Sequence, residues 1–227
     1  MVQFNLNARE LTLKVVYYGP ALSGKTTNLQ AIHQMVPAGG SGRLMTLETR
    51  DDRTLFFDLL PVHFRTRSGY KVKLKLFTVP GQVIHDSTRK VVLNGADGVV
   101  FVADSQIAES NANKDAFRNL RENLAANGLD MDAIPLVIQF NKRDLPNIRT
   151  DAELSALSSR RKTPIYPAVG ISGKGVLETL QGLMGLIWDA LDSSYELGQK
   201  LQLDRNTFLD QVFRDWNPQR VGGGFGP

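Results

Sequence analysis

Uninterrupted hydrophobic runs alternate along the chain with segments whose apolar residues recur at helical spacing. Residues 11–18 are rich in β-branched and aromatic side chains and end at Gly19, a pattern that predicts a buried strand. Residues 25–36 carry apolar side chains at helical spacing and stop before Pro37, so we expect a helix there. The same two patterns predict strands at residues 98–104, 134–140 and 165–169 and helices at residues 111–127 and 175–191.

The middle of the chain shows a different pattern, in which charged and apolar residues alternate. Residues 62–67 and 70–79 flank a Ser-Gly turn, and this arrangement predicts a hairpin with one solvated face. Residues 44–60 mix charged and apolar residues without a clear period, so we expect an irregular or mobile segment. Thr150 and Glu153 have the spacing of a capping box, which predicts the start of another helix.

The order of these elements predicts the fold class. Strands that alternate with helices favour one α/β domain with a mostly parallel central sheet, helices on both faces and right-handed crossovers. The hairpin would add one antiparallel edge strand. We therefore assign residues 1–195 to this domain and residues 196–227 to a C-terminal extension.

The extension combines an amphipathic helix with a glycine-rich tail. Its apolar residues recur at i, i+1, i+4, i+5 and i+8, in a stripe made of Phe208, Leu209, Val212, Phe213 and Trp216. Three arrangements would bury this stripe: packing against the domain, pairing with a second copy, or contact with a partner. We favour packing against the domain, because the apolar stripe of a helix usually faces the core of its own chain.

Composition narrows the possible classes of protein. With 42% hydrophobic and 22% charged residues among 227, the chain is neither collagen-like nor wholly disordered. It contains no cysteine, which excludes disulfides and cysteine nucleophiles and favours a reducing, cytoplasmic location. A net charge of +4 is too small to indicate nucleic-acid binding. We find no signal peptide and no apolar run near the roughly 18 residues that span a bilayer, so membrane contact would be peripheral at most.

The strongest chemical signal is the segment GPALSGKT at residues 19–26. It matches the phosphate-binding pattern G-x-x-x-x-G-K-[ST] where a predicted strand gives way to a predicted helix, and the alternative is an ordinary glycine turn with an exposed lysine. Backbone N–H groups of such a loop converge on phosphates, the lysine neutralises the β- and γ-phosphates, and the threonine binds Mg²⁺. The residues expected to hold the nucleotide phosphates are Gly19, Ala21, Leu22, Ser23, Gly24, Lys25, Thr26 and Thr27.

The segment NKRD at residues 141–144 points to the base of the nucleotide. It comes directly after the predicted buried strand 134–140. The Asp144 carboxylate would accept hydrogen bonds from the two guanine nitrogens N1–H and the exocyclic amine, a donor pair that adenine lacks. Taken alone, this short pattern is also compatible with a polar loop at a strand end, but after a phosphate-binding loop it favours guanine. We therefore expect Asn141, Lys142 and Asp144 to bind the base.

With these motifs, the chain resembles the small Ras-like GTPases. More narrowly, it resembles the bacterial gliding-motility GTPases of the MglA family in the stretches DRTLFFD, TVPGQ, DGVVFVADSQ and NKRDLPN. The resemblance covers about residues 8–192, most of the chain. It implies a P-loop G domain that binds GTP or GDP with Mg²⁺ and hydrolyses GTP.

Several site residues are implied by this resemblance alone. Thr54 would close over Mg²⁺ and the γ-phosphate, and the Gly81 N–H would contact that phosphate. Gln82 would orient the attacking water, while Arg53 would act as an intrinsic arginine finger or, alternatively, as a solvated loop residue. The implied catalytic set is Gln82, Arg53, Lys25, Thr54 and Gly81, and the implied metal set is Thr26 and Thr54, with Thr78 in the outer shell.

The chain departs from the Ras-like pattern at three places. Thr78 stands where most small GTPases have an aspartate, so we expect weaker retention of Mg²⁺. Ala21 stands where the family has glycine, and its methyl group should slow assisted hydrolysis. By the same resemblance, the loop from Val169 to Ile171 would back the guanine base, with Val169 and Gly170 as the assigned residues, although this loop lacks the usual Ser-Ala-Lys.

The resemblance implies a slow GTPase that acts as a switch in bacterial polarity or motility. Its partners would be a roadblock-fold homodimeric activator of the MglB type and polarity or motility effectors, and its location would be the cytoplasm, with recruitment to a cell pole or a membrane-associated complex. The alternative is a scaffold that binds GTP, hydrolyses little, and uses the extension as an interaction module. A basic surface for nucleic acid or anionic membrane is a third hypothesis, based on Arg65, Arg67, Lys71, Lys73 and Lys75. We favour a solvated edge for these residues, because lysines on an edge strand discourage aggregation.

Overall fold

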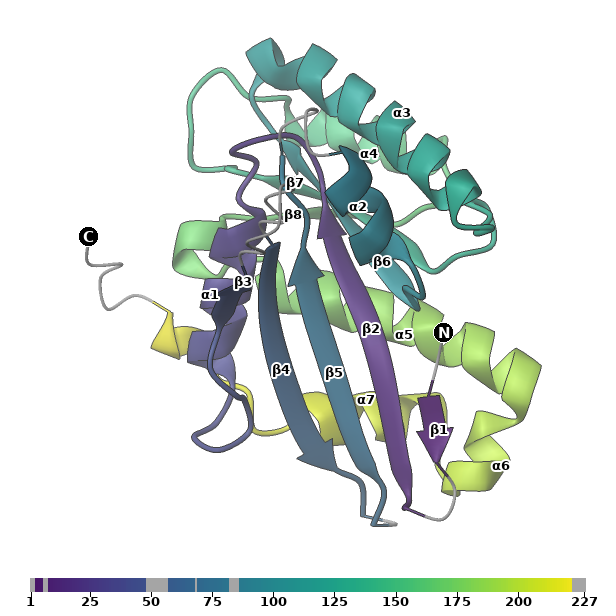
Figure 1. The fold of residues 1–227 in the computed structure, drawn as a ribbon. Helices are drawn as coiled ribbons and strands as arrows, with labels where there is room; N and C mark the ends of the chain where they lie inside the picture. The colour runs from purple at the N-terminus through teal and green to yellow at the C-terminus, as the bar shows by residue number, and fades with distance from the viewer. Residues whose placement is uncertain (1–2, 6–7, 48–56, 68, 82–85, 222–227) are drawn as a thin grey trace.

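One eight-stranded sheet forms the centre of the molecule (Figure 1). The structure is a computed structural model and describes residues 3–5, 8–47, 57–67, 69–81 and 86–221. The strands run in the order β3-β4-β5-β2-β6-β7-β8, and β1 pairs with β2. They are β1 (Gln3–Asn5), β2 (Glu10–Tyr18), β3 (Met45–Leu47), β4 (Phe57–Arg65), β5 (Lys71–Thr78), β6 (Gly98–Asp104), β7 (Leu136–Asn141) and β8 (Ile165–Pro167).

The sheet is parallel from β5 to β8 and antiparallel at the edge formed by β3 and β4. The short strand β1 adds a second antiparallel pairing, with β2. A mostly parallel sheet with an antiparallel edge from the hairpin is thus confirmed. The predicted strands and helices that alternate along the chain are all present, with ends shifted by a few residues.

Helices cover both faces of this sheet. They are α1 (Lys25–Met35), α2 (Asp86–Leu93), α3 (Ser110–Ala126), α4 (Asp151–Ser159), α5 (Val176–Tyr195), α6 (Leu197–Leu201) and α7 (Arg205–Phe213), with short 3₁₀ turns η2 (Ile107–Glu109), η3 (Gly170–Ser172) and η4 (Pro218–Arg220). Helices α1, α5, α6 and α7 pack on one face, and α2, α3 and α4 pack on the other. Two helical layers around one sheet are the three-layer arrangement that the alternating pattern predicts.

The central strands are largely apolar where both of their faces are buried. In β2, Val15 and Tyr17 belong to the core under α1 and α5, whereas Val16 and Tyr18 belong to the core under α2 and α3. Successive side chains of a strand point to opposite faces, so a strand covered on both sides needs an unbroken apolar run. The hairpin strand β5 has helices over one face only, and its lysines lie on the other.

The expectation of an irregular segment at residues 44–60 was wrong at both of its ends. Strand β3 occupies residues 45–47, and β4 begins at Phe57, five residues before the predicted strand start. The reason is Asp58, which occupies an inward, buried position of β4 together with Leu60 and Val62. A charged residue at an inward position hides the two-residue period from the hydrophobic pattern.

The C-terminal extension packs against the domain. Phe208 of α7 stacks on Trp188 of α5 at 4.6 Å between ring centroids and meets Phe64 of β4 edge-on at 6.0 Å. Further along, the backbone N–H of Asn217 donates to the carbonyl oxygen of Met35 at the end of α1 (3.0 Å). Of the three arrangements that would bury the apolar stripe, the structure therefore contains the contact with the domain.

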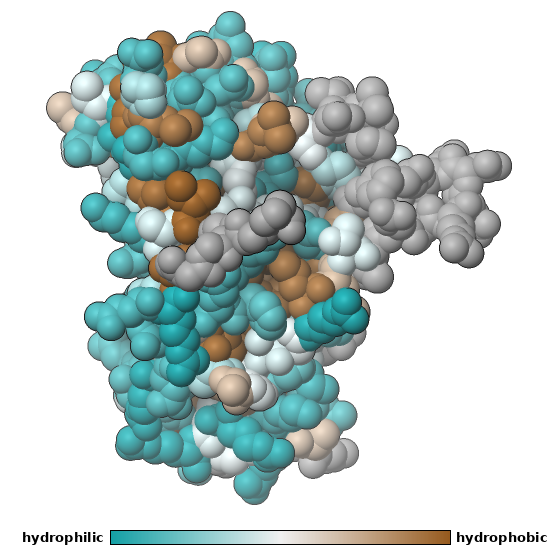
Figure 2. All heavy atoms as spheres, turned by 90° about the vertical axis from the view of Figure 1, so that its left-hand side faces the viewer, coloured by the Kyte–Doolittle hydropathy of each residue, from teal (hydrophilic) through white to brown (hydrophobic). Residues whose placement is uncertain are grey.

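The surface on the side of α1 and β3 is mostly hydrophilic and carries separate hydrophobic patches (Figure 2). None of the helices in the described part of the chain combines the length and the apolar character needed to cross a bilayer.

Candidate functional site

The predicted phosphate-binding loop lies between the end of β2 and the start of α1. Gly24 is the N-cap of α1 and has a φ of 96°, in the left-handed region. A Cβ atom on Gly24 would lie 2.2 Å from Nδ2 of Asn141. Both the backbone conformation and the close approach therefore require glycine here, and the N-terminus of α1 opens toward a cavity of about 400 Å³.

Lys25 is a buried cation without an anionic hydrogen-bond partner among the described residues. Its side chain is 7% exposed, and its Nζ donates to the carbonyl oxygens of Gly19 (3.1 Å) and Pro20 (2.6 Å). Burial and, to a smaller extent, the positive charge of Arg89 lower the pKa of Lys25, and Asp58 opposes them, so that the pKa is about 7 instead of 10.5. A buried ammonium group held only by neutral carbonyls is well suited to receive phosphate oxygens.

A second feature of the loop also fits the binding of an anion. The hydroxyl of Ser23 is fully buried and has no hydrogen-bond partner among the described residues. Buried polar groups are normally paired, so an unpaired donor beside Lys25 indicates a ligand oxygen.

Asp58 supplies a buried carboxylate that the sequence analysis missed. Its Oδ2 accepts hydrogen bonds from the hydroxyls of Thr26 (2.6 Å) and Thr78 (3.0 Å), and its Oδ1 accepts one from Thr46 (2.9 Å). The backbone N–H of Asp58 also donates to the Thr78 hydroxyl (2.9 Å). Asp58 lies on β4 and Thr78 on the adjacent β5, so the carboxylate stands directly beside the position where most small GTPases have theirs.

The oxygen groups around Asp58 fit Mg²⁺. This ion prefers oxygen ligands, keeps several waters, and uses one or two protein groups together with substrate phosphates. Thr26 and Asp58 both line the cavity of about 400 Å³, beside Lys25. The described residues contain no group of three or more histidine, aspartate or glutamate side chains that would form an all-protein metal site. A cation here would therefore depend on phosphate oxygens.

The predicted base-binding residues line a neighbouring cavity of about 240 Å³. Asn141, Lys142, Asp144 and Gly170 lie in its wall, and it shares Leu22, Gly24 and Thr27 with the phosphate cavity. The two cavities thus meet at the phosphate-binding loop. Among the described residues, the predicted phosphate and base residues converge on one edge of the sheet, where the carboxyl ends of the parallel strands lie.

Asn141 joins the two parts of this site. Its Nδ2 donates to the carbonyl oxygen of Ser23 (2.9 Å), and its Oδ1 accepts from the backbone N–H of Gly170 (2.8 Å). Lys142 forms an ion pair with Asp104 at the end of β6 (2.6 Å). Both residues therefore hold the loops around the base cavity, and Asp144 remains exposed at its edge.

Only part of the loop expected to back the base lies at the base cavity. Gly170 and Ile171 line the base cavity, but Val169 does not. The N–H of Val169 donates to the carbonyl oxygen of Lys174 (2.8 Å), and the N–H of Gly170 is occupied by Asn141. Of the loop from Val169 to Ile171, this geometry leaves Ile171, which is 57% exposed, as the residue best placed to face the base.

Gly81 packs directly against the phosphate-binding loop. A Cβ atom on Gly81 would lie 2.2 Å from Cα of Ala21 and 3.0 Å from its methyl group. The backbone of Ala21 is thus the closest part of the phosphate-binding loop to Gly81, and its methyl group lies next to this contact. The other implied catalytic residues, Arg53, Thr54 and Gln82, lie outside the described residues.

The comparison with known proteins agrees with this geometry. No family model matches the chain. The chain is 50% identical over 183 residues to the mutual gliding-motility protein MglA of Myxococcus xanthus (strain DK1622), and the match covers 81% of this chain and 94% of that protein. The similarity is therefore high and spans nearly the whole relative. At this identity and coverage, the chain belongs to the MglA family of Ras-like small GTPases.

Proposed function

We propose that this protein is a nucleotide-dependent switch that binds GTP or GDP with Mg²⁺ and hydrolyses GTP slowly. The observation that carries this proposal is the meeting of two cavities at the phosphate-binding loop, one beside Lys25 and Asp58 and the other beside Asn141 and Asp144. Such a pair of cavities has room for phosphates on one side and a base on the other.

Each half of the site has a defined chemical task in this proposal. Lys25 binds the β- and γ-phosphates and returns to its charged form when their oxygens replace the loop carbonyls. Thr26 would bind Mg²⁺ through its hydroxyl, and Asp58, which already accepts a hydrogen bond from that hydroxyl, would support the ion from the outer shell. Mg²⁺ itself supplies positive charge against the charge that develops on the phosphate oxygens. Asp144 selects guanine over adenine through its two acceptor oxygens.

The catalytic step is assigned to residues around the γ-phosphate. Gln82 orients the attacking water. Thr54 and Gly81 bind the γ-phosphate and thereby stabilise the ordered conformation of their loops. Arg53 stabilises the charge that develops during transfer. These loops would order with GTP and relax after hydrolysis, so a partner could read the difference.

The name of the Myxococcus xanthus relative supports a role in motility. We therefore propose that polarity or motility effectors bind the GTP form in the cytoplasm and that a roadblock-fold homodimer of the MglB type accelerates hydrolysis. Recruitment to a cell pole or to a membrane-associated complex belongs to the same proposal.

A specific observation favours a second candidate, a GTP-bound scaffold with little hydrolysis. The methyl group of Ala21 lies against Gly81, at the point where the catalytic groups must approach the γ-phosphate. Crowding at this point would slow turnover without preventing binding.

Single-turnover hydrolysis of GTP and ATP, with Mg²⁺ and with or without the roadblock-fold partner from the same genome, tests the proposal. We expect GTP turnover that the partner accelerates and no turnover of ATP. Asp144→Asn should lose guanine selectivity, whereas the matched control Asp115→Asn, an exposed residue of α3, should not. Tight GTP binding without acceleration would support the scaffold, and equal use of ATP would contradict both candidates.

A further inference from the structure

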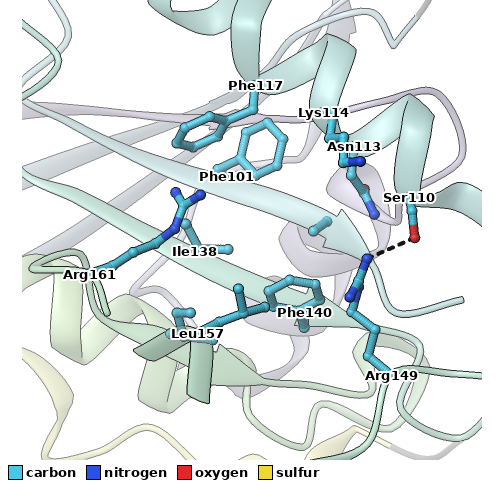
Figure 3. A pocket seen from close by; sticks show the side chains of 12 residues that line it. Phe101, Ser110, Asn113, Lys114, Phe117, Ile138, Phe140, Arg149, Leu157 and Arg161 are labelled. Carbon is cyan, nitrogen blue, oxygen red and sulfur yellow. Dashed lines mark hydrogen bonds between the residues drawn. The ribbon is translucent and has the colours of Figure 1, made fainter. Parts of the chain in front are cut away.

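A separate cavity of about 250 Å³ opens between α3 and α4 (Figure 3). It shares no lining residue with the phosphate or base cavities. Its floor consists of apolar side chains from the last three strands of the sheet, which are Phe101, Ala103, Ile138, Phe140 and Ile165. Phe117 of α3 and Leu157 of α4 complete the apolar wall. An apolar ligand would thus be enclosed by three strands and two helices.

Positively charged side chains surround this apolar floor. Lys114, Arg149 and Arg161 line the cavity, and none of the described lining residues is acidic. The guanidinium of Arg161 lies over the ring of Phe117 at 5.5 Å, and Nη2 of Arg149 donates to the hydroxyl of Ser110 (2.9 Å). Figure 3 shows the two guanidinium groups on opposite sides of the apolar side chains.

The other polar group of the cavity is already satisfied. The side chain of Asn113 donates to the carbonyl oxygen of Asp104 (2.8 Å) and accepts from its N–H (2.9 Å). It therefore holds α3 against the end of β6. The available polar recognition in the cavity thus comes from cationic groups, which favour an anion.

We propose that this cavity binds a small amphiphilic anion, with a flat or branched apolar body and one carboxylate or similar group. The apolar body would occupy the floor, and the anionic group would pair with one of the two guanidinium groups at its margin. The volume is slightly below the roughly 300–1,000 Å³ typical of sites for drug-sized ligands, so the ligand is small. This inference does not rest on the proposed GTPase function.

Isothermal titration calorimetry of the full chain with 2-naphthoate, in the presence of saturating GDP, tests the proposal. The uncharged 2-naphthylmethanol serves as a matched ligand of similar shape. We expect one naphthoate per chain and binding of the alcohol that is about tenfold weaker, because a charge-assisted hydrogen bond contributes roughly this factor. GDP should not compete with naphthoate.

Variants locate the binding at the cavity. Arg149→Gln combined with Arg161→Gln should weaken naphthoate binding about tenfold and leave alcohol binding unchanged. Arg118→Gln is the matched control, since Arg118 lies on α3, is exposed and does not line the cavity. Leu157→Trp should fill the cavity and weaken binding of both ligands, which tests the site independently of charge.

Three results would overturn the inference. Equal affinity for the acid and the alcohol would remove the anionic preference. Unchanged naphthoate binding in both the double arginine variant and Leu157→Trp would place the ligand elsewhere. Tighter binding of an acetylated Asp-Phe-Asp peptide than of naphthoate would assign the cavity to a protein partner instead of a small molecule.

Discussion

Asp58 and Thr78 lie on neighbouring strands and are hydrogen-bonded to each other beside the expected Mg²⁺ site. Thr78 provides a neutral hydroxyl where most small GTPases have a carboxylate, and this hydroxyl donates to Asp58 on the adjacent strand (3.0 Å). Asp58 also accepts a hydrogen bond (2.6 Å) from the hydroxyl of Thr26, which is the expected Mg²⁺ ligand. A carboxylate is therefore present beside the expected metal position, and it comes from β4 instead of β5. Weak Mg²⁺ retention was expected from Thr78 alone. With Asp58 beside it, we expect this carboxylate to compensate for the missing aspartate at position 78.

Replacing Asp58 by asparagine should weaken Mg²⁺ binding about 10–100-fold, as is typical when an outer-shell partner is lost. The readout is the rate of GDP release at increasing Mg²⁺ concentrations, which does not depend on hydrolysis. Thr46→Val is the control, because it removes a hydroxyl from the other carboxylate oxygen and keeps the charge. An unchanged Mg²⁺ dependence in Asp58→Asn would show that Asp58 has no role at the metal.

The lowered pKa of Lys25 makes the stability of the nucleotide-free protein depend on pH. The pKa is lowered to about 7 from an ordinary value of 10.5, mainly by burial, so between these values the unfolded chain binds more protons than the folded protein. The free energy of unfolding should therefore rise with pH across this window. Urea unfolding at several pH values measures the slope.

Lys25→Met isolates this contribution, because it removes the titrating group from both states. We expect the variant to have a smaller slope than the wild type between pH 7 and 10.5. Saturating GDP should reduce the wild-type slope, since phosphate oxygens restore the charged form of the lysine. Identical slopes in wild type and variant would contradict the assignment.

Ala21 lies where the phosphate-binding loop and Gly81 approach most closely. Ala21→Gly removes the methyl group from this contact and should increase the partner-stimulated rate of GTP hydrolysis several-fold, because better alignment of reacting groups raises the rate. Single-turnover hydrolysis measures this rate, and GDP affinity should stay unchanged. No increase would exclude Ala21 as the cause of slow turnover.

At the scale of elements, a buried polar network connects the end of β5 to helices α2 and α3. Arg89 of α2 is 1% exposed and donates to the carbonyl oxygens of Pro80 (2.9 Å) and Gly81 (2.5 Å). It also donates to Asn119 of α3 (2.5 Å), which in turn donates to Asp86 (2.8 Å). The guanidinium therefore fixes the backbone that leads into the implied catalytic glutamine.

Loss of this buried cation should be costly. Arg89→Met should lower the free energy of unfolding by about 1–3 kcal/mol, the penalty for leaving buried hydrogen-bond acceptors without their donor. Chemical denaturation measures this loss. Lys90→Ala is the control, because Lys90 is adjacent, half-exposed and forms a surface ion pair with Asp86 at 3.3 Å, and its loss should cost less than about 1 kcal/mol. Equal effects would contradict the role of Arg89.

The elements show where sequence patterns succeed and where they fail. The predicted strand at residues 98–104 has the observed bounds of β6, and the capping box is confirmed by the Thr150 hydroxyl, which accepts from the N–H of Glu153 (3.2 Å). Helix α2 was not predicted. Its buried face includes Thr88 and Arg89, and polar residues that are buried through hydrogen bonds do not contribute to a hydrophobic pattern.

At the scale of the whole molecule, the C-terminal extension shares the core of the domain. Phe208 is 1% exposed between Trp188 and Phe64, and Trp216 is 8% exposed beside Phe213. These aromatic contacts join α7 to both a helix and a strand. We therefore expect the extension and the domain to unfold together in a single transition.

Phe208→Ala tests this expectation. Removing a buried phenylalanine should lower the free energy of unfolding of the whole chain by about 3–5 kcal/mol. Urea unfolding, followed by tryptophan fluorescence and by circular dichroism, should give coincident transitions. Tyr195→Ala is the control, because Tyr195 is 52% exposed and its loss should change stability by less than about 1 kcal/mol. A separate early transition for the extension would contradict a shared core.

The sequence by itself determined the order of strands and helices, the phosphate-binding loop and the NKRD segment. Each of these signals lies within a few consecutive residues, because hydrophobic periodicity, caps and glycine-framed loops are local properties of the backbone. The tertiary structure alone decided that Asp58 meets Thr78, that Arg89 holds the Gly81 carbonyl and that a cavity opens between α3 and α4. These contacts join segments whose proximity follows from strand pairing and helix packing, and no short stretch of sequence encodes it.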